Sequence, residues 1–173
     1  KRDLMDPVPL LKRILADPRS ALRLQSVRTL KLIGTAATIP VLGGAAIDHQ
    51  QSVAVRFAAV DALGAVALQD LGPIGTEVAA ANIRTARLQG IPPLVNPHVL
   101  KRHHQLQVGY LAQIVRDSNS SSALTLGAVK SMGRIKDRST IPVLQEIIET
   151  HKDQAVRRQA GKTLSHVIAT QYE

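Results

Sequence analysis

The side chains in this sequence that are best suited to metal binding are its six histidines: His49, His98, His103, His104, His151 and His166. None lies in a His-Glu-x-x-His pattern or four residues from another histidine, the spacing that brings two imidazoles onto one face of a helix. His103 and His104 are adjacent, so on a helix they diverge by about 100 degrees and do not readily share one ion. We therefore expect no metal site.

Residues for acid–base or covalent catalysis are equally sparse. Glu146 and Glu149 are three residues apart, as paired carboxylates on one helix would be, but they flank apolar residues in a pattern that is typical of a solvated helix face. The sequence has no Gly-x-Ser-x-Gly, no phosphate-binding loop and no cysteine, so no residue is a candidate covalent nucleophile. We assign no catalytic residue and no cofactor, and expect a binding protein rather than an enzyme.

Any binding residues must be positioned by the repeated apolar segments of the chain. One set of similar segments recurs about every 33 residues, at Pro9, Pro40, Pro73, Gly109 and Pro142. An aliphatic residue followed by arginine or threonine recurs 13 to 15 residues after most of these, at Leu22-Arg23, Val55-Arg56, Leu124-Thr125 and Val156-Arg157. Further small or apolar residues lie five and eight positions after each aliphatic residue, which traces one face of a helix.

These spacings predict pairs of helices. Aromatic residues make up only 2% of the chain, so the core must consist of Leu, Ile, Val and Ala, which favours helix-on-helix packing. The helices are expected over about 7–16, 20–34, 38–47, 51–68, 73–88, 98–116, 121–135, 139–151 and 153–170.

The recurring residues also match the pattern of a known repeat. A HEAT unit has a proline in its first helix, an aspartate about eight residues later and an aliphatic–arginine pair opening its second helix; Pro9, Asp17 and Leu22-Arg23 fit this closely. Pro142, Asp153 and Val156-Arg157 fit more loosely. The sequence resembles the HEAT repeats and, through 62–64 and 131–137, the phycobilisome-lyase-type HEAT-like repeats.

The resemblance implies an all-α, right-handed α-solenoid of about 4.5 helical hairpins, with residues 1–173 as one domain or as part of a longer solenoid. It also implies that Asp17, Arg23, Arg56 and Arg157 make structural contacts between neighbouring units. Function does not follow from such a fold by itself.

The third unit departs from the pattern. Its expected second helix is interrupted at 90–97, where two adjacent prolines, Pro92 and Pro93, stop a helix. A basic tract, 101–104, follows directly. Two interpretations stay open for residues 89–106: a functional insertion, or a kink in the superhelix.

A candidate binding surface follows from the helix period. If Leu22, Ser26, Leu30 and Ile33 face the core, then Leu24, Arg28 and Lys31 lie on the opposite side. Equivalent positions in the other second helices give one apolar row and one mainly basic row, and the resemblance implies that these helices line the concave surface. With the basic tract, the candidate partner-binding residues are Leu24, Arg28, Lys31, Phe57, Asp61, Lys101, Arg102, Leu126, Lys130, Arg158 and Lys162. An ordinary solvated surface is the alternative interpretation.

Charge narrows the choice of partner. The chain has 22 Lys and Arg against 13 Asp and Glu, a net charge of +9, so an acidic partner is expected. The family resemblance suggests a phycobiliprotein or phycobilisome component, with the chain acting as a chaperone-like scaffold, a phycobilin-lyase accessory subunit or half of a heterodimer. Nucleic acid is the alternative, although the chain has few aromatic residues for base stacking. We also expect a soluble protein without a membrane span, in the cytoplasm or an equivalent reducing compartment.

Overall fold

The computed structural model describes residues 6–66, 76–90 and 97–172; the side chains of residues 76–82 and 172 lie outside this description. All regular structure in these ranges is helical, which confirms the all-α prediction. The helices are α1 (Val8–Ala16), α2 (Arg23–Ile33), α3 (Thr38–Ile47), α4 (Val53–Ala65), α5 (Thr76–Gln89), α6 (Pro97–Arg116), α7 (Ser122–Ile135), α8 (Thr140–Thr150) and α9 (Gln154–Tyr172). No described helix has the length and apolar character needed to cross a membrane.

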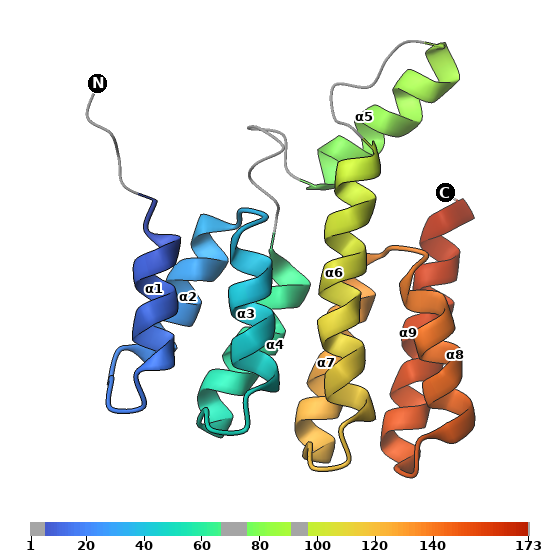
Figure 1. Ribbon diagram of the computed structural model, residues 1–173. Helices are drawn as coiled ribbons and strands as arrows, with labels where there is room; N and C mark the ends of the chain where they lie inside the picture. The colour runs from blue at the N-terminus through green and yellow to red at the C-terminus, as the bar shows by residue number, and fades with distance from the viewer. Residues whose placement is uncertain (1–5, 67–75, 91–96, 173) are drawn as a thin grey trace, which may run out of the picture.

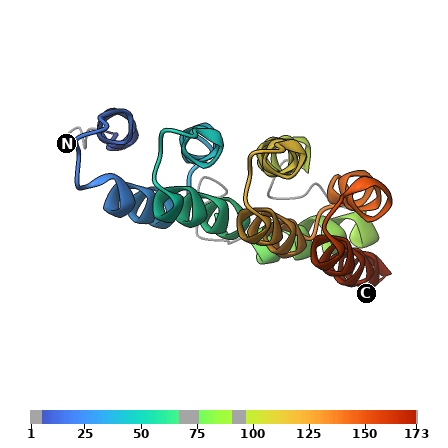
Figure 2. The ribbon, with the colours of Figure 1, turned by 90° about the horizontal axis from the view of Figure 1, so that it is seen from below.

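The helices form antiparallel pairs stacked in two layers (Figures 1 and 2). The first layer contains α1, α3, α6 and α8, and the second layer contains α2, α4, α7 and α9. In the second layer α2 packs on α4, α4 on α7, and α7 on α9. Each pair buries its apolar face against its neighbours, as expected for a helical repeat protein.

Local sequence signals explain where many of these helices begin and end. Ser52 and Ser121 precede α4 and α7, and their hydroxyls accept hydrogen bonds from the backbone N–H groups of Val55 and Leu124, at 3.4 and 3.3 Å. Pro40 and Pro142 are tolerated because they lie in the first turn of α3 and α8, where a backbone N–H has no helical partner. Gly34 ends α2 with a positive φ of 58°, the left-handed conformation common after helices.

The core is built from aliphatic side chains, with Leu30, Leu42, Leu63, Leu111 and Leu144 fully buried. Small residues let some helices approach closely. A Cβ added at Gly64 of α4 would lie 2.5 Å from the Cβ of Ser131 of α7. Close packing of this kind substitutes for the bulk that aromatic residues would supply.

The expected third repeat is not stacked between its neighbours. The α3/α4 pair packs directly against the α6/α7 pair, and α5 lies beyond the amino-terminal end of α6 (Figure 1). Buried hydrogen bonds join the two pairs: Gln107 donates to the carbonyl oxygen of Leu63 at 2.8 Å, and Ser131 donates to that of Val60 at 2.9 Å. Chain segments far apart in sequence are therefore neighbours. Pro73, which marked the third unit, and residues 91–96, which suggested that this unit is irregular, lie outside the described residues.

The prediction that Leu22 faces the core is wrong, because its side chain is 59% exposed. Leu22 is the residue immediately before α2, which begins at Arg23, so its side chain lies at the end of the helix. Further along the helix the same phase is confirmed, since Ser26 and Leu30 are buried and Ile33 packs against the core.

Candidate interaction surface

Two arginines of the repeat pattern, Arg23 and Arg56, make structural contacts between neighbouring units, as the repeat resemblance implied. Arg56 is buried, and its Nε donates to the carbonyl oxygen of Ala46 at 3.0 Å while Nη2 donates to Ser120 of the next pair at 3.4 Å. Arg23 reaches Gln51 of the following pair at 3.3 Å. These two side chains join neighbouring units, so they do not form a free binding surface.

Within the described part of the chain, Asp17 and Arg157 make only local hydrogen bonds. Asp17 accepts from the backbone N–H of Arg19 at 2.9 Å, and Arg157 donates to the carbonyl oxygen of His151 at 2.6 Å. The contacts between units that the resemblance implied for these two residues are absent from the hydrogen bonds of the described residues.

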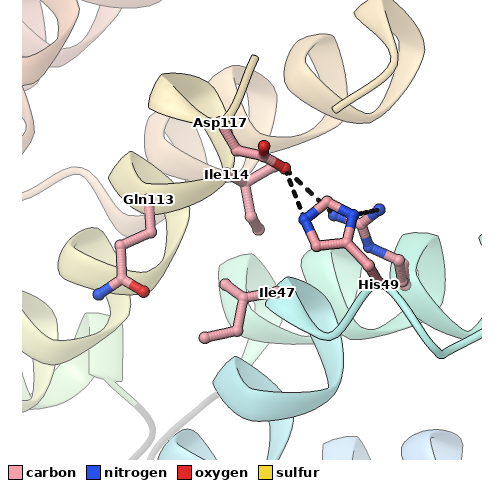
Figure 3. A pocket seen from close by; sticks show the side chains of 6 residues that line it. Ile47, His49, Gln113, Ile114 and Asp117 are labelled. Atoms are coloured by element: carbon pink, nitrogen blue, oxygen red, sulfur yellow. Dashed lines mark hydrogen bonds and ion pairs between the residues drawn. The ribbon is translucent and has the colours of Figure 1, made fainter. Parts of the chain in front are cut away.

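A small cavity of about 190 Å³ lies where the α3–α4 turn meets the end of α6. Figure 3 shows the His49 ring directed at Asp117, with Ile47 and Ile114 nearby. His49 Nε2 lies 3.1 Å from the Asp117 carboxylate, and its Nδ1 lies 3.4 Å from Arg56 Nη1. Burial alone would raise the pKa of Asp117, but hydrogen bonds from Asn119 and Ser120 and the nearby His49 and Arg56 hold it below its ordinary value.

This polar cluster does not have the geometry of a catalytic triad. Ser120 donates its hydroxyl proton to Asp117 at 2.8 Å, so serine and histidine both contact the carboxylate instead of each other. The cluster therefore connects two helical pairs. The sequence could not predict the contact between His49 and Asp117, because the two residues belong to different repeats.

The basic tract at the start of α6 divides into two parts. Lys101 and Arg102 are exposed on the first layer, whereas His104 is mostly buried and lies 3.1 Å from the Asp137 carboxylate. Among the described residues, no group of three His, Cys, Asp or Glu side chains is arranged to hold a metal. Lys101 and Arg102 lie on a different layer from the other candidate binding residues, so the predicted sites do not form one surface.

The glutamate pair on α8 also separates into two roles. Glu146 accepts two hydrogen bonds from Arg116 of α6, one of them 2.9 Å long, and these hold the pKa of Glu146 below its usual range. Glu149 is exposed. The expectation of a solvated face is correct for Glu149, but Glu146 links two first-layer helices.

The remaining candidates lie on the outward side of the second layer. We call this surface the second-layer face and define it by Arg28, Lys31, Asp61, Lys130, Arg134, Arg158 and Lys162. Lys31 of α2 contacts Asp61 of α4 at 2.8 Å, and Arg134 of α7 contacts the other oxygen of the same carboxylate. Three successive helices therefore bring charges to one surface. Arg134 was not among the sequence candidates, although its position four residues after Lys130 places both on one helix side.

The apolar row under this face is less exposed than the helix period predicted. Leu24, Phe57 and Leu126 are half-buried and pack against the core. A Cβ added at Gly127 of α7 would lie 3.7 Å from the Phe57 ring, so the ring covers the glycine of the neighbouring helix. Helical periodicity considers one helix at a time and cannot include this cover from an adjacent helix. The row forms a partly accessible floor between the charged residues.

Charge compensation on the second-layer face is uneven. Burial raises the pKa of Asp61, but hydrogen bonds and positive charge from Lys31 and Arg134 outweigh this effect and lower it overall. Arg28, Lys130, Arg158 and Lys162 are exposed and form no ion pair with any described carboxylate. The face is therefore electropositive, most of all along α7 and α9.

Comparison with known proteins agrees with this architecture. A family model described as HEAT repeats matches residues 7–88 and 110–171, most of the chain. Comparison with curated proteins finds no matching sequence.

Proposed function

Because this chain belongs to the HEAT-repeat family, whose repeats generally mediate protein–protein interactions, we propose that it is a scaffold whose second-layer face binds an acidic protein. The observation that carries this proposal is the set of exposed cations that form no ion pair with a described carboxylate, namely Arg28, Lys130, Arg158 and Lys162. The half-buried floor of Leu24, Phe57 and Leu126 adds apolar contact area beside the charges. Mixed apolar and charged surfaces are typical of protein interfaces, in which charge complementarity steers association.

A finer proposal concerns the identity of the partner. The similarity of 62–64 and 131–137 to lyase-type repeats supports a phycobiliprotein or phycobilisome component, with this chain as a chaperone-like accessory subunit in bilin attachment. The check is a reconstituted mixture of a purified phycobiliprotein, its bilin and the corresponding catalytic subunit. Binding of the phycobiliprotein and a change in the rate of bilin transfer support this role, and the absence of both contradicts it.

The broader proposal is tested by charge reversal on the second-layer face. A Lys130→Glu, Lys162→Glu double variant should lose capture of acidic proteins from a fractionated lysate, because both positions change from attracting to repelling carboxylates. The matched control is Lys12→Glu, Arg13→Glu, which reverses two exposed charges on α1 of the first layer. Phe57 is kept unchanged, since its ring packs against α7 and its replacement would disturb folding.

The outcomes are distinct. Loss of capture in the second-layer variant with retention in the α1 control supports the proposal, and equal capture by both variants and the wild type contradicts it. Reversal of Lys101 and Arg102 should leave capture intact, because these residues lie on α6 of the first layer. Tight binding of duplex DNA with a steep loss of affinity in salt, abolished by the same double variant, would assign the face to nucleic acid instead.

A further inference from the structure

The distribution of charge on the second-layer face identifies which part of it is available to a partner. The Asp61 carboxylate forms ion pairs with Lys31 on one side and with Arg134 on the other. It therefore already neutralises positive charge at the junction of α2, α4 and α7. A partner carboxylate approaching there would have to compete with Asp61.

At the next junction no described carboxylate pairs with the exposed cations, and Asp153 contacts Ser122 of α7 and the backbone N–H of Ala155 instead. Helix α7 packs against α9, and the exposed cations there are Lys130, Arg158 and Lys162. None forms an ion pair with a described carboxylate. We call these three residues, together with the half-buried Leu126, the α7–α9 strip.

Resting on the proposed function, we infer that the α7–α9 strip is the docking site for an acidic amphipathic helix, and that Asp61 marks the edge of this site. Arg158 and Lys162 are four residues apart on α9, and side chains with this separation lie about 5–6 Å apart on a helix. Carboxylates with the same separation on a partner helix would meet both cations at once.

Packing at this junction is compatible with a helix as the occupant. The residue beside the cations on α9 is short: Ala155 is exposed and lies three residues before Arg158, on the same side of the helix. Short side chains let a partner backbone approach, so its apolar side could contact Leu126 while its carboxylates pair with the flanking cations. Helix-on-helix packing is also how every described second-layer helix meets its neighbour.

Fluorescence anisotropy with a designed probe tests the inference. The probe is a labelled amphipathic helical peptide with glutamates at i and i+4, and the comparison peptide is identical except for two central prolines that prevent a helix. The wild-type chain should bind the helical peptide at least about 10-fold more tightly, because only the helix presents its carboxylates with the required spacing.

Three variants locate the site. Arg158→Glu, Lys162→Glu should weaken binding of the helical peptide by at least about 10-fold, whereas Arg28→Glu at the α2 end should change it by less than about 2-fold. Asp61→Asn keeps the shape of the side chain and releases Lys31 and Arg134, so it should tighten binding by about 3-fold. Thermal unfolding of each variant checks that the fold is retained.

The contrary results separate this inference from the broader proposal. Equal weakening by the Arg28 and α9 variants, equal affinity for the two peptides, or no tightening in Asp61→Asn would overturn the inference while leaving an acidic protein partner in place. Failure of the wild type to bind either peptide, together with no capture of acidic proteins, would overturn both. Displacement of the peptide by duplex DNA at lower concentration than by an acidic protein would assign the strip to nucleic acid.

Discussion

At the scale of single residues, most of the polar groups that could have suggested chemistry are used to connect helical pairs. Asp137 follows α7 and accepts from His104 of α6 at 3.1 Å and from the backbone N–H of Ser139 at 2.8 Å. Burial raises the pKa of Asp137, but the hydrogen bonds from His104 and Ser139 and the His104 charge outweigh it and lower the pKa to about 2. A lowered carboxylate pKa means that ionised Asp137 stabilises the folded state.

The pH dependence of stability should reveal this contribution. An unfolded aspartate titrates near pH 3.9, so the stabilisation from Asp137 is complete above about pH 4 and disappears as the pH falls toward 2. Asp137→Asn should lower the free energy of unfolding by about 2 kcal/mol at pH 5, and the gap from wild type should close near pH 2. Urea unfolding followed by circular dichroism measures both values.

The control for this experiment is Glu149→Gln, which removes an exposed carboxylate from α8. Its free energy of unfolding should stay within about 0.5 kcal/mol of wild type at pH 5. A deficit in Asp137→Asn that is the same at pH 5 and pH 2 would show that the residue stabilises the fold through shape rather than charge.

At the scale of helices and their pairs, close approach depends on particular small residues. Between α4 and α7, a Cβ at Gly64 would lie 2.5 Å from the Ser131 Cβ and 2.7 Å from its Cα. Because the Cα belongs to the backbone, a side-chain rotation cannot relieve this contact. Gly109 on α6 provides the opposite case, since it is exposed and nothing lies within 4 Å of an added Cβ.

Alanine substitutions should therefore have opposite effects at these two glycines. Gly64→Ala should destabilise the protein by about 1–3 kcal/mol, because the α4–α7 contact must open. Gly109→Ala should stabilise it by about 0.5–1 kcal/mol, because alanine loses less backbone entropy in a helix. Chemical denaturation of both variants tests the pair, and a stabilising Gly64→Ala would contradict the direct packing of α4 on α7.

At the scale of the whole molecule, the fold is a linear stack in which each pair contacts mainly its neighbours. Helices α4 and α7 have second-layer neighbours on both sides, whereas α2 and α9 have a described neighbour on one side only. In such stacks stability depends on the interfaces between adjacent units. Among the described pairs, the central ones are held by two interfaces and the outer ones by one.

Hydrogen exchange should show this gradient. Backbone amides of α4 and α7 should exchange most slowly, and those of α1 and α2 should exchange faster, because the first pair can open without disrupting the rest. Mass spectrometry of deuterium uptake with peptide-level resolution measures the order. Uniform protection in all four helices would indicate a single cooperative unit and contradict the picture of stacked pairs.

The amino-acid sequence by itself determined the helical class, the approximate helix boundaries and most core positions. These depend on local signals, such as the serines before α4 and α7 and the apolar period that buries Ser26 and Leu30. The exposure of charged residues on the second-layer face could likewise be predicted from their own helices, and Arg28, Lys130 and Lys162 are exposed as their positions predicted.

Only the tertiary structure decided which residues are neighbours across repeats. The direct stacking of α3/α4 on α6/α7, the cover of Gly127 by Phe57, and the sharing of Asp61 between Lys31 and Arg134 all join residues that are distant in sequence. Helical periodicity assigns a side chain to a face of its own helix, but the adjacent helix determines whether that face is covered, paired or open. The uneven charge of the second-layer face therefore emerges only when the helices are packed together.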